Sequence, residues 1–386
     1  MKQGLREVVG VAAAVGFAML ALSGCNFFVP QTNSTGPGGI GTTGDFAYVS
    51  NSSSGSTSIS AYGLSAGTLA PLSTATYNLQ FVPTAMAIPK GNAFLYVASQ
   101  SGGIYLYSIG SDGTLTAANS GSPIVSGNLV GAMDISPDGN YLFTVDVTGS
   151  VLTQFTITPS TGALSGSLTA DLPINSVTGS NSCTGLLPCQ VKVAPSEQYV
   201  VVALGTTGDA IFPFTAPNLS TALVIDNLAS GVGDYAVTID ASNNVYFART
   251  NLIAAYSLST GTPTLVTTTP PAGAAGTRGI VLSSDDKFLY EGDYATNPAT
   301  PGPIYQFSTT TSGVVAPLTP TTISAPTSVF SLAVDNSGKY LLALGYNTTS
   351  GLALYSIGAS GTLSSATTSV ATGASTTTPA VMALTH

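Results

Sequence analysis

A repeat with a spacing of 42 to 59 residues constrains this chain more than any other feature of its sequence. Its two clearest copies, Tyr107–Leu115 (YSIGSDGTL) and Tyr355–Leu363 (YSIGASGTL), agree at seven of nine positions. The repeat is marked by an aromatic residue between short strand-forming segments, at Tyr62, Tyr107, Phe155, Phe214, Tyr256, Phe307 and Tyr355. Periods of this length are typical of propeller blades and solenoid units, so the sequence predicts seven structural units.

Each repeat contains four strand-forming segments. In the third repeat, Ala132–Ser136 is followed by an Asp-Gly turn and then by Tyr141–Asp146. Val151–Thr158 and a last segment near Leu164 complete this repeat. An Asp-Gly pair supplies the positive φ angles that a tight hairpin needs. Four strands in one repeat predict a propeller blade, which buries its two faces by stacking on its neighbours.

The two ends of the repeat region predict how the ring closes. The first repeat lacks a first strand of its own, and Pro379–His386 resembles the first strand of the second repeat, Pro83–Lys90. We therefore expect Val381–Leu384 to pair beside Tyr48, because a closed ring leaves no unpaired inner edge. The predicted fold is all-β: a seven-bladed β-propeller of four-stranded blades over residues 45–386, closed by the C-terminal strand.

The N-terminus carries an export signal. Lys2 and Arg6 precede an apolar run, Val8–Leu22, which is shorter than the roughly 20 residues of a membrane-spanning helix. The sequence therefore predicts a signal peptide over residues 1–24. Leu22–Cys25 resembles the bacterial lipobox, and this resemblance implies lipidation of Cys25. The alternative is a plain secretory signal with an incidental cysteine.

Residues 25–44 are rich in Gly and Pro, without the periodicity of a strand or helix, and predict a flexible tether. The expected location is that of an exported, membrane-anchored lipoprotein: outer membrane or periplasm in a Gram-negative host, and the cell surface otherwise. In such an oxidising compartment, Cys183 and Cys189 are expected to form a disulfide that closes a small loop.

Charge and residue usage exclude several classes of function. The chain of 386 residues has 8 Lys and Arg against 17 Asp and Glu, a formal net charge of −9. This balance argues against nucleic acid or anionic lipid headgroups as partners, because both are bound by clustered basic residues. The sole histidine is His386, so a Ser-His-Asp or Cys-His catalytic set and a structural zinc site are not expected. We expect a monomer without a cofactor.

Short motifs within the repeats carry a family resemblance. Tyr48–Asn51 (YVSN) and Tyr96–Ser99 (YVAS), with degenerate copies at Phe143–Asp146, Tyr246–Arg249 and Tyr290–Asp293, resemble YVTN-type repeats. The chain from residue 44 onward resembles the lactonase-like seven-bladed β-propellers, the family that includes bacterial 6-phosphogluconolactonase. This resemblance implies the propeller fold, and it implies the opening of carbohydrate lactones as an activity.

The order of strands in a blade sorts the charged residues onto two faces of the predicted ring. The hairpin turns between first and second strands collect charges that we interpret as solvated turn residues: Lys90, Asp138, Asp285, Asp286, Lys287 and Lys339. The opposite face, where propellers bind ligands, collects Asp146, Asp209, Asp234, Arg249, Arg278, Glu291 and Asp293. This second set contains the candidate ligand-binding residues.

Three interpretations of these candidates are open. Arg249 and Arg278 are expected to be neighbours across a blade interface, and together they could clamp a carboxylate or phosphate. Alternatively, each forms a structural ion pair with Asp234, Glu291 or Asp293. In the third interpretation, Asp209, Glu291 and Asp293 bind a calcium ion, although no D-x-D-x-D loop supports this.

Two functions follow from these interpretations. The preferred one is a non-catalytic, lipid-anchored propeller whose loop face binds an envelope protein or a surface polysaccharide. The other is a lactonase-like hydrolase, for which Glu291 or Asp293 would activate water and Arg278 would stabilise the oxyanion. The spacing of the residues does not decide between them.

Overall fold

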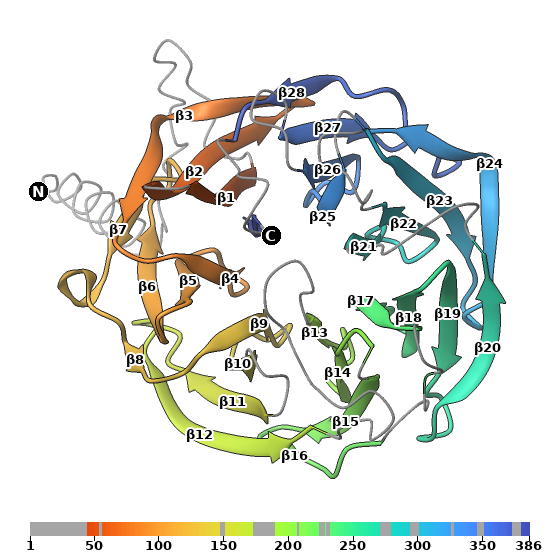
Figure 1. Cartoon of the computed structure of the whole chain (residues 1–386), viewed down its shortest axis with the longest axis horizontal. Coiled ribbons are helices and arrows are strands. Elements are labelled where there is room, and N and C mark those ends of the chain that lie inside the picture. The colour runs from red at the N-terminus through yellow and green to blue at the C-terminus, as the bar shows by residue number, and fades with distance from the viewer. Residues whose placement is uncertain are drawn as a thin grey trace, which may run out of the picture. The chain divides into compact units, whose positions relative to one another are not determined.

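The computed structural model forms a ring of seven antiparallel sheets, shown in Figure 1. The residues that it describes are 45–53, 56–146, 151–172, 190–206, 208–223, 228, 232–270, 279–293, 301–325, 328–345, 351–372 and 380–386. Within them each sheet has four strands in a row, and the first strand of each lies nearest the ring axis. The predicted all-β, seven-bladed propeller is confirmed.

The first three blades have the following strands, from the innermost outward. Blade 1 consists of β29 (Met382–Leu384), β1 (Asp45–Ser53), β2 (Ser56–Ser65) and β3 (Thr68–Leu79). Blade 2 consists of β4 (Pro83–Ala87), β5 (Phe94–Ser99), β6 (Gly103–Ile109) and β7 (Leu115–Ala117), followed by the short 3₁₀ helix η1 (Asn119–Gly121) and by β8 (Val125–Ser126), which also pairs with β6. Blade 3 consists of β9 (Val130–Ile135), β10 (Tyr141–Asp146), β11 (Val151–Ile157) and β12 (Leu164–Asp171).

The other four blades follow the same order. Blade 4 consists of β13 (Gln190–Val193), β14 (Tyr199–Ala203), β15 (Asp209–Thr215) and β16 (Asn218–Leu219). Blade 5 consists of β17 (Asp234–Ile239), β18 (Asn244–Arg249), β19 (Leu252–Ser257) and β20 (Thr264–Thr269). Blade 6 consists of β21 (Gly279–Leu282), β22 (Phe288–Gly292), β23 (Pro303–Thr309) and β24 (Val315–Ser324). Blade 7 consists of β25 (Val329–Val334), β26 (Tyr340–Gly345), β27 (Leu352–Ser356) and β28 (Thr368–Val370).

The strand sequences follow from how each strand is covered. A second strand such as β14 (YVVVA) is buried at every position, because neighbouring blades cover both of its faces. An outermost strand such as β12 (LSGSLTAD) is exposed along most of its length and carries Ser and Thr. The seven repeating aromatics all lie on third strands and are buried, as the repeat predicts.

The ring closes between the two ends of the propeller. Strand β29 pairs antiparallel with β1, with Ala383 opposite Tyr48. The amide of Phe46 donates to the Thr385 hydroxyl at 2.7 Å, and the amide of Ser50 donates to the Val381 carbonyl at 2.9 Å. The predicted closure by the C-terminal strand is therefore confirmed.

The part of the chain that the structure describes begins with the propeller, at Asp45. Residues 1–44, with the predicted signal peptide, Cys25 and tether, lie outside it. Within the part that the structure describes, we find no helix of the length and hydropathy that a membrane crossing requires.

Candidate functional site

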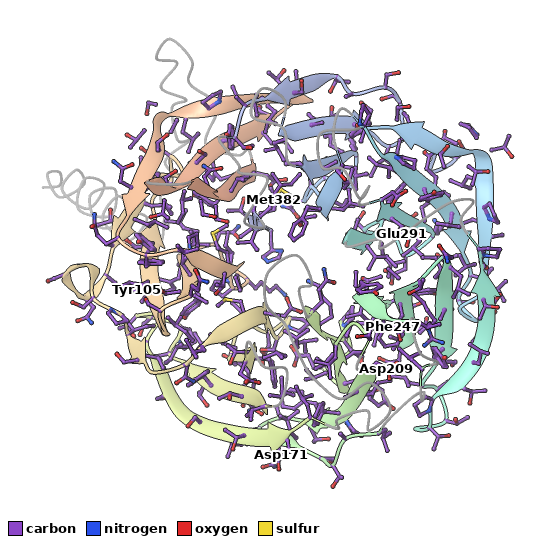
Figure 2. The ribbon with its side chains drawn as sticks, viewed as in Figure 1. Tyr105, Asp171, Asp209, Phe247, Glu291 and Met382 are labelled. Carbon is purple, nitrogen blue, oxygen red and sulfur yellow. The ribbon has the colours of Figure 1, made fainter. Side chains whose placement is uncertain are left out.

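One face of the ring gathers the charged residues that the sequence singles out. We call it the site face, defined by the ends of the second strands and the starts of the first and third strands. Arg249 ends β18, Glu291 lies near the end of β22, Asp234 begins β17 and Asp209 begins β15. Figure 2 shows Asp209 and Glu291 in the right-hand half of the ring. Blades 4 to 6 therefore contribute these four residues.

Arg249 and Asp234 form a buried, bidentate ion pair. They lie opposite each other on adjacent strands of blade 5. The Arg249 Nε donates to Asp234 Oδ1 at 2.8 Å, and its Nη2 donates to Asp234 Oδ2 at 2.9 Å. The Asp234 side chain is 0% exposed and that of Arg249 is 11% exposed. The ion-pair alternative is thus the one that the structure shows for Arg249.

The same guanidinium also reaches blade 4. Its Nη2 lies 3.8 Å from Asp209 Oδ2, and its Nη1 donates to the Tyr256 hydroxyl at 3.2 Å. The Arg249 Cζ atom is 5.7 Å from the centre of the Tyr256 ring. Because all three nitrogens of Arg249 already contact protein groups, this arginine is held as an inter-blade tie, and binding an anion would require it to exchange partners.

Glu291 occupies a position that other blades fill with a core residue. It follows Tyr290 in the repeat motif, where blades 2 and 5 carry Val97 and Phe247. Its side chain is nevertheless 0% exposed, and Asp293 two residues later is 8% exposed. Charged residues are rarely fully buried in proteins, so the buried carboxyl group of Glu291 is a distinctive feature of blade 6.

Tyr305 lies beside the carboxyl groups of Glu291 and Asp293. It lies opposite Glu291 in the pairing of β22 with β23. Burial raises the pKa of Tyr305 to about 12, and the negative charges of Asp293 and Glu291 act in the same direction. The phenol therefore stays protonated and neutral beside the two carboxyl groups at physiological pH.

The Arg249–Asp234 ion pair and the Glu291 side chain lie in adjacent gaps between blades. Arg249 faces blade 4 through Asp209, whereas Glu291 shares its face of blade 6 with Ile280 and Tyr305, which pack against Ala248 of blade 5. Among the described residues, no three acidic, His or Cys side chains are placed to hold a metal ion. The structure thus does not bring Asp209, Glu291 and Asp293 together in the way the calcium interpretation requires.

Several predicted residues lie outside the described ranges: Cys25, Cys183, Cys189 and Arg278. The lipidation, the disulfide and the expected contact between the two arginines therefore stay predictions. Asp146 lies at the end of β10, on the site face but in blade 3.

The opposite face has a role that sequence reasoning missed. Three of its carboxylates each accept a hydrogen bond from a backbone amide in the preceding blade: Glu197 from Asp138, Asp286 from Ala241, and Asp45 from Asn336. These residues therefore join blade to blade instead of only facing water. Glu197 and Asp286 have positive φ angles (58° and 56°), which the sequence does not predict.

Comparison with known proteins supports the fold. No family model and no curated protein matches the chain. Among solved structures, the chain is similar to a proposed 6-phosphogluconolactonase from Bacteroides fragilis, with 17% identity, a TM-score of 0.66, and coverage of 88% of this chain and 98% of that one. It is also similar to a periplasmic gluconolactonase from Pseudomonas aeruginosa, with 16% identity, a TM-score of 0.65, and coverage of 88% and 98%.

A third similar structure has no assigned function. It is a protein from Desulfotomaculum acetoxidans, with 13% identity, a TM-score of 0.60, and coverage of 88% of this chain and 99% of that one. The chain is thus a seven-bladed β-propeller with the fold of lactonase-like propellers. At these identities, the similarity extends to the fold alone.

Proposed function

We propose that the protein is a ligand-binding propeller of the cell envelope, which takes an uncharged polyhydroxylated molecule, a sugar or a sugar lactone, at its site face between blades 4 and 6. In this proposal the lipid on Cys25 anchors the propeller and residues 25–44 separate it from the membrane. In the envelope, the sugar that the propeller binds would belong to a surface polysaccharide.

The net negative charge of blades 4 to 6 on the site face is the observation that carries the proposal. These blades contribute four acids (Asp209, Asp234, Glu291 and Asp293) and one base (Arg249) among the described residues, and Asp234 already holds that base in a bidentate pair. Arg278, immediately before β21 in the sequence, would still leave two acids in excess. This excess of negative charge would repel a phosphorylated or carboxylated ligand, whereas an uncharged sugar would not be repelled.

Lactone hydrolysis is the second candidate function. Glu291 favours it, because blade 6 places a carboxyl group where blades 2 and 5 place Val97 and Phe247. Two of the similar structures are described as lactonases, and the one from Pseudomonas aeruginosa as a periplasmic gluconolactonase, which fits an exported propeller. In this function Glu291 or Asp293 would activate the attacking water, and Arg278 would stabilise the oxyanion.

A titration of the full chain carrying Cys25→Ser tests the proposal and separates the two functions. We expect binding of methyl glucosides and glucono-lactone, at least 10-fold weaker binding of the 6-phosphorylated lactone, and no lactone turnover above the spontaneous rate. Tighter binding of the phosphorylated compound would contradict the charge argument. Turnover that Glu291→Gln abolishes would make the protein a hydrolase.

Fractionation of cells tests the location. Wild-type protein is expected with the membranes, and the Cys25→Ser variant in the soluble exported fraction. A variant that stays with the membranes to the same extent would overturn the lipid anchor.

A further inference from the structure

Blade 1 is the blade whose first strand is not joined to its second strand by a hairpin. Its first strand is β29 and its second is β1, and the two come from opposite ends of the propeller. In every other blade a short turn connects these two strands, as the turn between β9 and β10 does in blade 3. Strand β29 is three residues long and pairs with β1 at three positions. It can therefore separate from β1 without opening a hairpin, so blade 1 needs another restraint.

A reciprocal pair of hydrogen bonds ties the end of β29 to blade 2. The amide of His386 donates to Asn92 Oδ1 at 2.8 Å, and Asn92 Nδ2 donates to the His386 carbonyl at 2.7 Å. The His386 Nε2 also lies 3.1 Å from the Ile88 carbonyl oxygen. Asn92 has a φ of +56°, which asparagine adopts more readily than most other residues with a side chain. The hairpin of blade 2 thus places an amide side chain where it meets the backbone that follows β29.

A second contact ties the start of β1 to blade 7. Asp45 is the first residue of β1, and its Oδ2 accepts a hydrogen bond of 2.7 Å from the amide of Asn336. Asn336 lies in the hairpin between β25 and β26. Blade 7 therefore holds the start of the second strand of blade 1.

These two contacts lie at the same end of blade 1. The amide of Phe46 donates to the Thr385 hydroxyl at 2.7 Å, and the amide of Thr385 donates to the Phe46 carbonyl at 3.0 Å. This exchange places Asp45 and His386, the next residue on each strand, at one end of the β29–β1 pair. It is the end at which the other blades have the turn between their first and second strands.

We propose that the Asn92–His386 and Asp45–Asn336 contacts form a clasp, which takes the place of the missing hairpin and holds β29 in the ring. The clasp grips both loose ends of blade 1, one from blade 2 and the other from blade 7. Similar contacts elsewhere, such as Asn243 of blade 5 with Gln198 of blade 4, join blades whose first two strands are already connected. Loss of such a contact loosens an interface, whereas loss of the clasp frees a strand. The inference is independent of the ligand that the site face binds.

Hydrogen–deuterium exchange of the full chain carrying Cys25→Ser tests the clasp. The reporters are the peptides that contain β29 and β1, because the amides of Ser50 and Thr385 bond between these strands. Asn92→Gly keeps the positive φ and removes both hydrogen bonds to His386, and Asp45→Ala removes the acceptor for Asn336. Each variant should speed exchange of the two reporters about 10-fold, while the strands of blade 4 exchange as in wild type.

Asn243→Gly is the matched control. Asn243 is also an asparagine with a positive φ, of 63°, and its Nδ2 donates to Gln198 Oε1 of the preceding blade at 2.9 Å. This variant should leave the exchange of β29 and β1 unchanged, because both strands keep their clasp. Asp45→Asn keeps an oxygen that can accept from the Asn336 amide, so it should exchange like wild type.

The possible outcomes decide between a clasp and an ordinary contact between blades. Exchange of both reporters within about 2-fold of wild type in Asn92→Gly and Asp45→Ala would overturn the clasp. Equal acceleration of the reporters in Asn243→Gly would also overturn it, because the loss of any inter-blade contact would then loosen β29. Acceleration spread evenly over all blades would indicate lower global stability, and this result too would overturn a local clasp.

Discussion

The hydroxyl of Tyr96, in blade 2, donates a hydrogen bond of 2.7 Å to the carbonyl of Gly162, in the last hairpin of blade 3. The relationship recurs around the ring, because Tyr48 donates to Gly113 at 2.8 Å and Tyr290 to Gly361 at 2.7 Å. The tyrosine that begins the YVSN-type motif is thus an inter-blade contact. Its repetition reflects the geometry of the ring and does not indicate an activity.

Removal of one such hydroxyl should destabilise the propeller. Tyr96→Phe leaves the Gly162 carbonyl without its buried donor, which should reduce the free energy of unfolding by about 1–3 kcal/mol. Urea unfolding followed by circular dichroism measures the change. Tyr141→Phe is the control, because Tyr141 is partly exposed, and it should change stability by less than about 0.5 kcal/mol. Equal losses in both variants would contradict the role of the hydrogen bond.

Glycine in the last hairpin of a blade allows the neighbouring blade to approach. Gly361 has a φ of +79°, and a Cβ there would lie 2.1 Å from the Phe288 Cδ1 of blade 6. Gly261 is the matched control in blade 5, with the same φ of +79° and no atom within 4 Å of its Cβ position. Gly261→Ala should cost only the backbone strain of about 1–2 kcal/mol.

Gly361→Ala should cost at least about 2 kcal/mol more than this control, because the added methyl group overlaps an aromatic ring. Thermal and urea unfolding of both variants measure the difference. Equal losses would show that the contact between blades adjusts freely around the added methyl group.

The fold could be predicted from the sequence, because the pattern of one blade recurs seven times along the chain. Seven aromatic positions correspond to seven third strands, and the resemblance of Pro379–His386 to Pro83–Lys90 predicted the pairing of Ala383 with Tyr48. Strand order also placed Asp209, Asp234, Arg249 and Glu291 on one face. These features follow from a pattern that recurs in every blade.

The partners of individual side chains could not be predicted in this way. Arg249 reaches Asp209 of blade 4, because its strand alternates, and the direction of that alternation is visible only in the pairing of strands. The inter-blade contacts of Glu197 and Asp286 were missed as well, because sequence contains no distance between the turns of neighbouring blades.

Asp286 should make the stability of the ring depend on pH. Burial raises its pKa above the ordinary value of 3.8, and the charges of Asp240 and Asp285 add to the rise. A raised carboxyl pKa means that the folded state binds the proton more tightly, so this contribution to stability is present at low pH and is lost as pH rises through the folded-state pKa.

Asp286→Asn tests this sign. Asparagine keeps an oxygen that can accept from the Ala241 amide but carries no charge. The variant should be slightly more stable than wild type at pH 7, and the difference should shrink as pH falls toward about 3. Asp112→Asn is the control with the opposite sign: hydrogen bonds from the Thr114 hydroxyl and amide lower the pKa of Asp112, so its contribution is lost as pH falls. A stability difference for Asp286→Asn that grows toward low pH would contradict the prediction.

The buried pair of Arg249 and Asp234 should show strong coupling in a double-mutant cycle. Arg249→Met leaves the Asp234 carboxylate, which is 0% exposed, without its bidentate partner, and should cost about 3–5 kcal/mol. Asp234→Leu alone leaves the guanidinium with the longer 3.8 Å contact to Asp209, so it should also be strongly destabilising. The double variant should lose less than the sum of the two single losses, because neither Arg249 nor Asp234 is left as a buried charge without the other, although Asp209 still loses its 3.8 Å contact. Lys287 and Asp285 provide the matched exposed pair at 2.9 Å, for which Lys287→Met should cost less than about 1 kcal/mol. Additive losses at Arg249 and Asp234 would mean that the two side chains stabilise the propeller independently, and that the inter-blade tie does not depend on their ion pair.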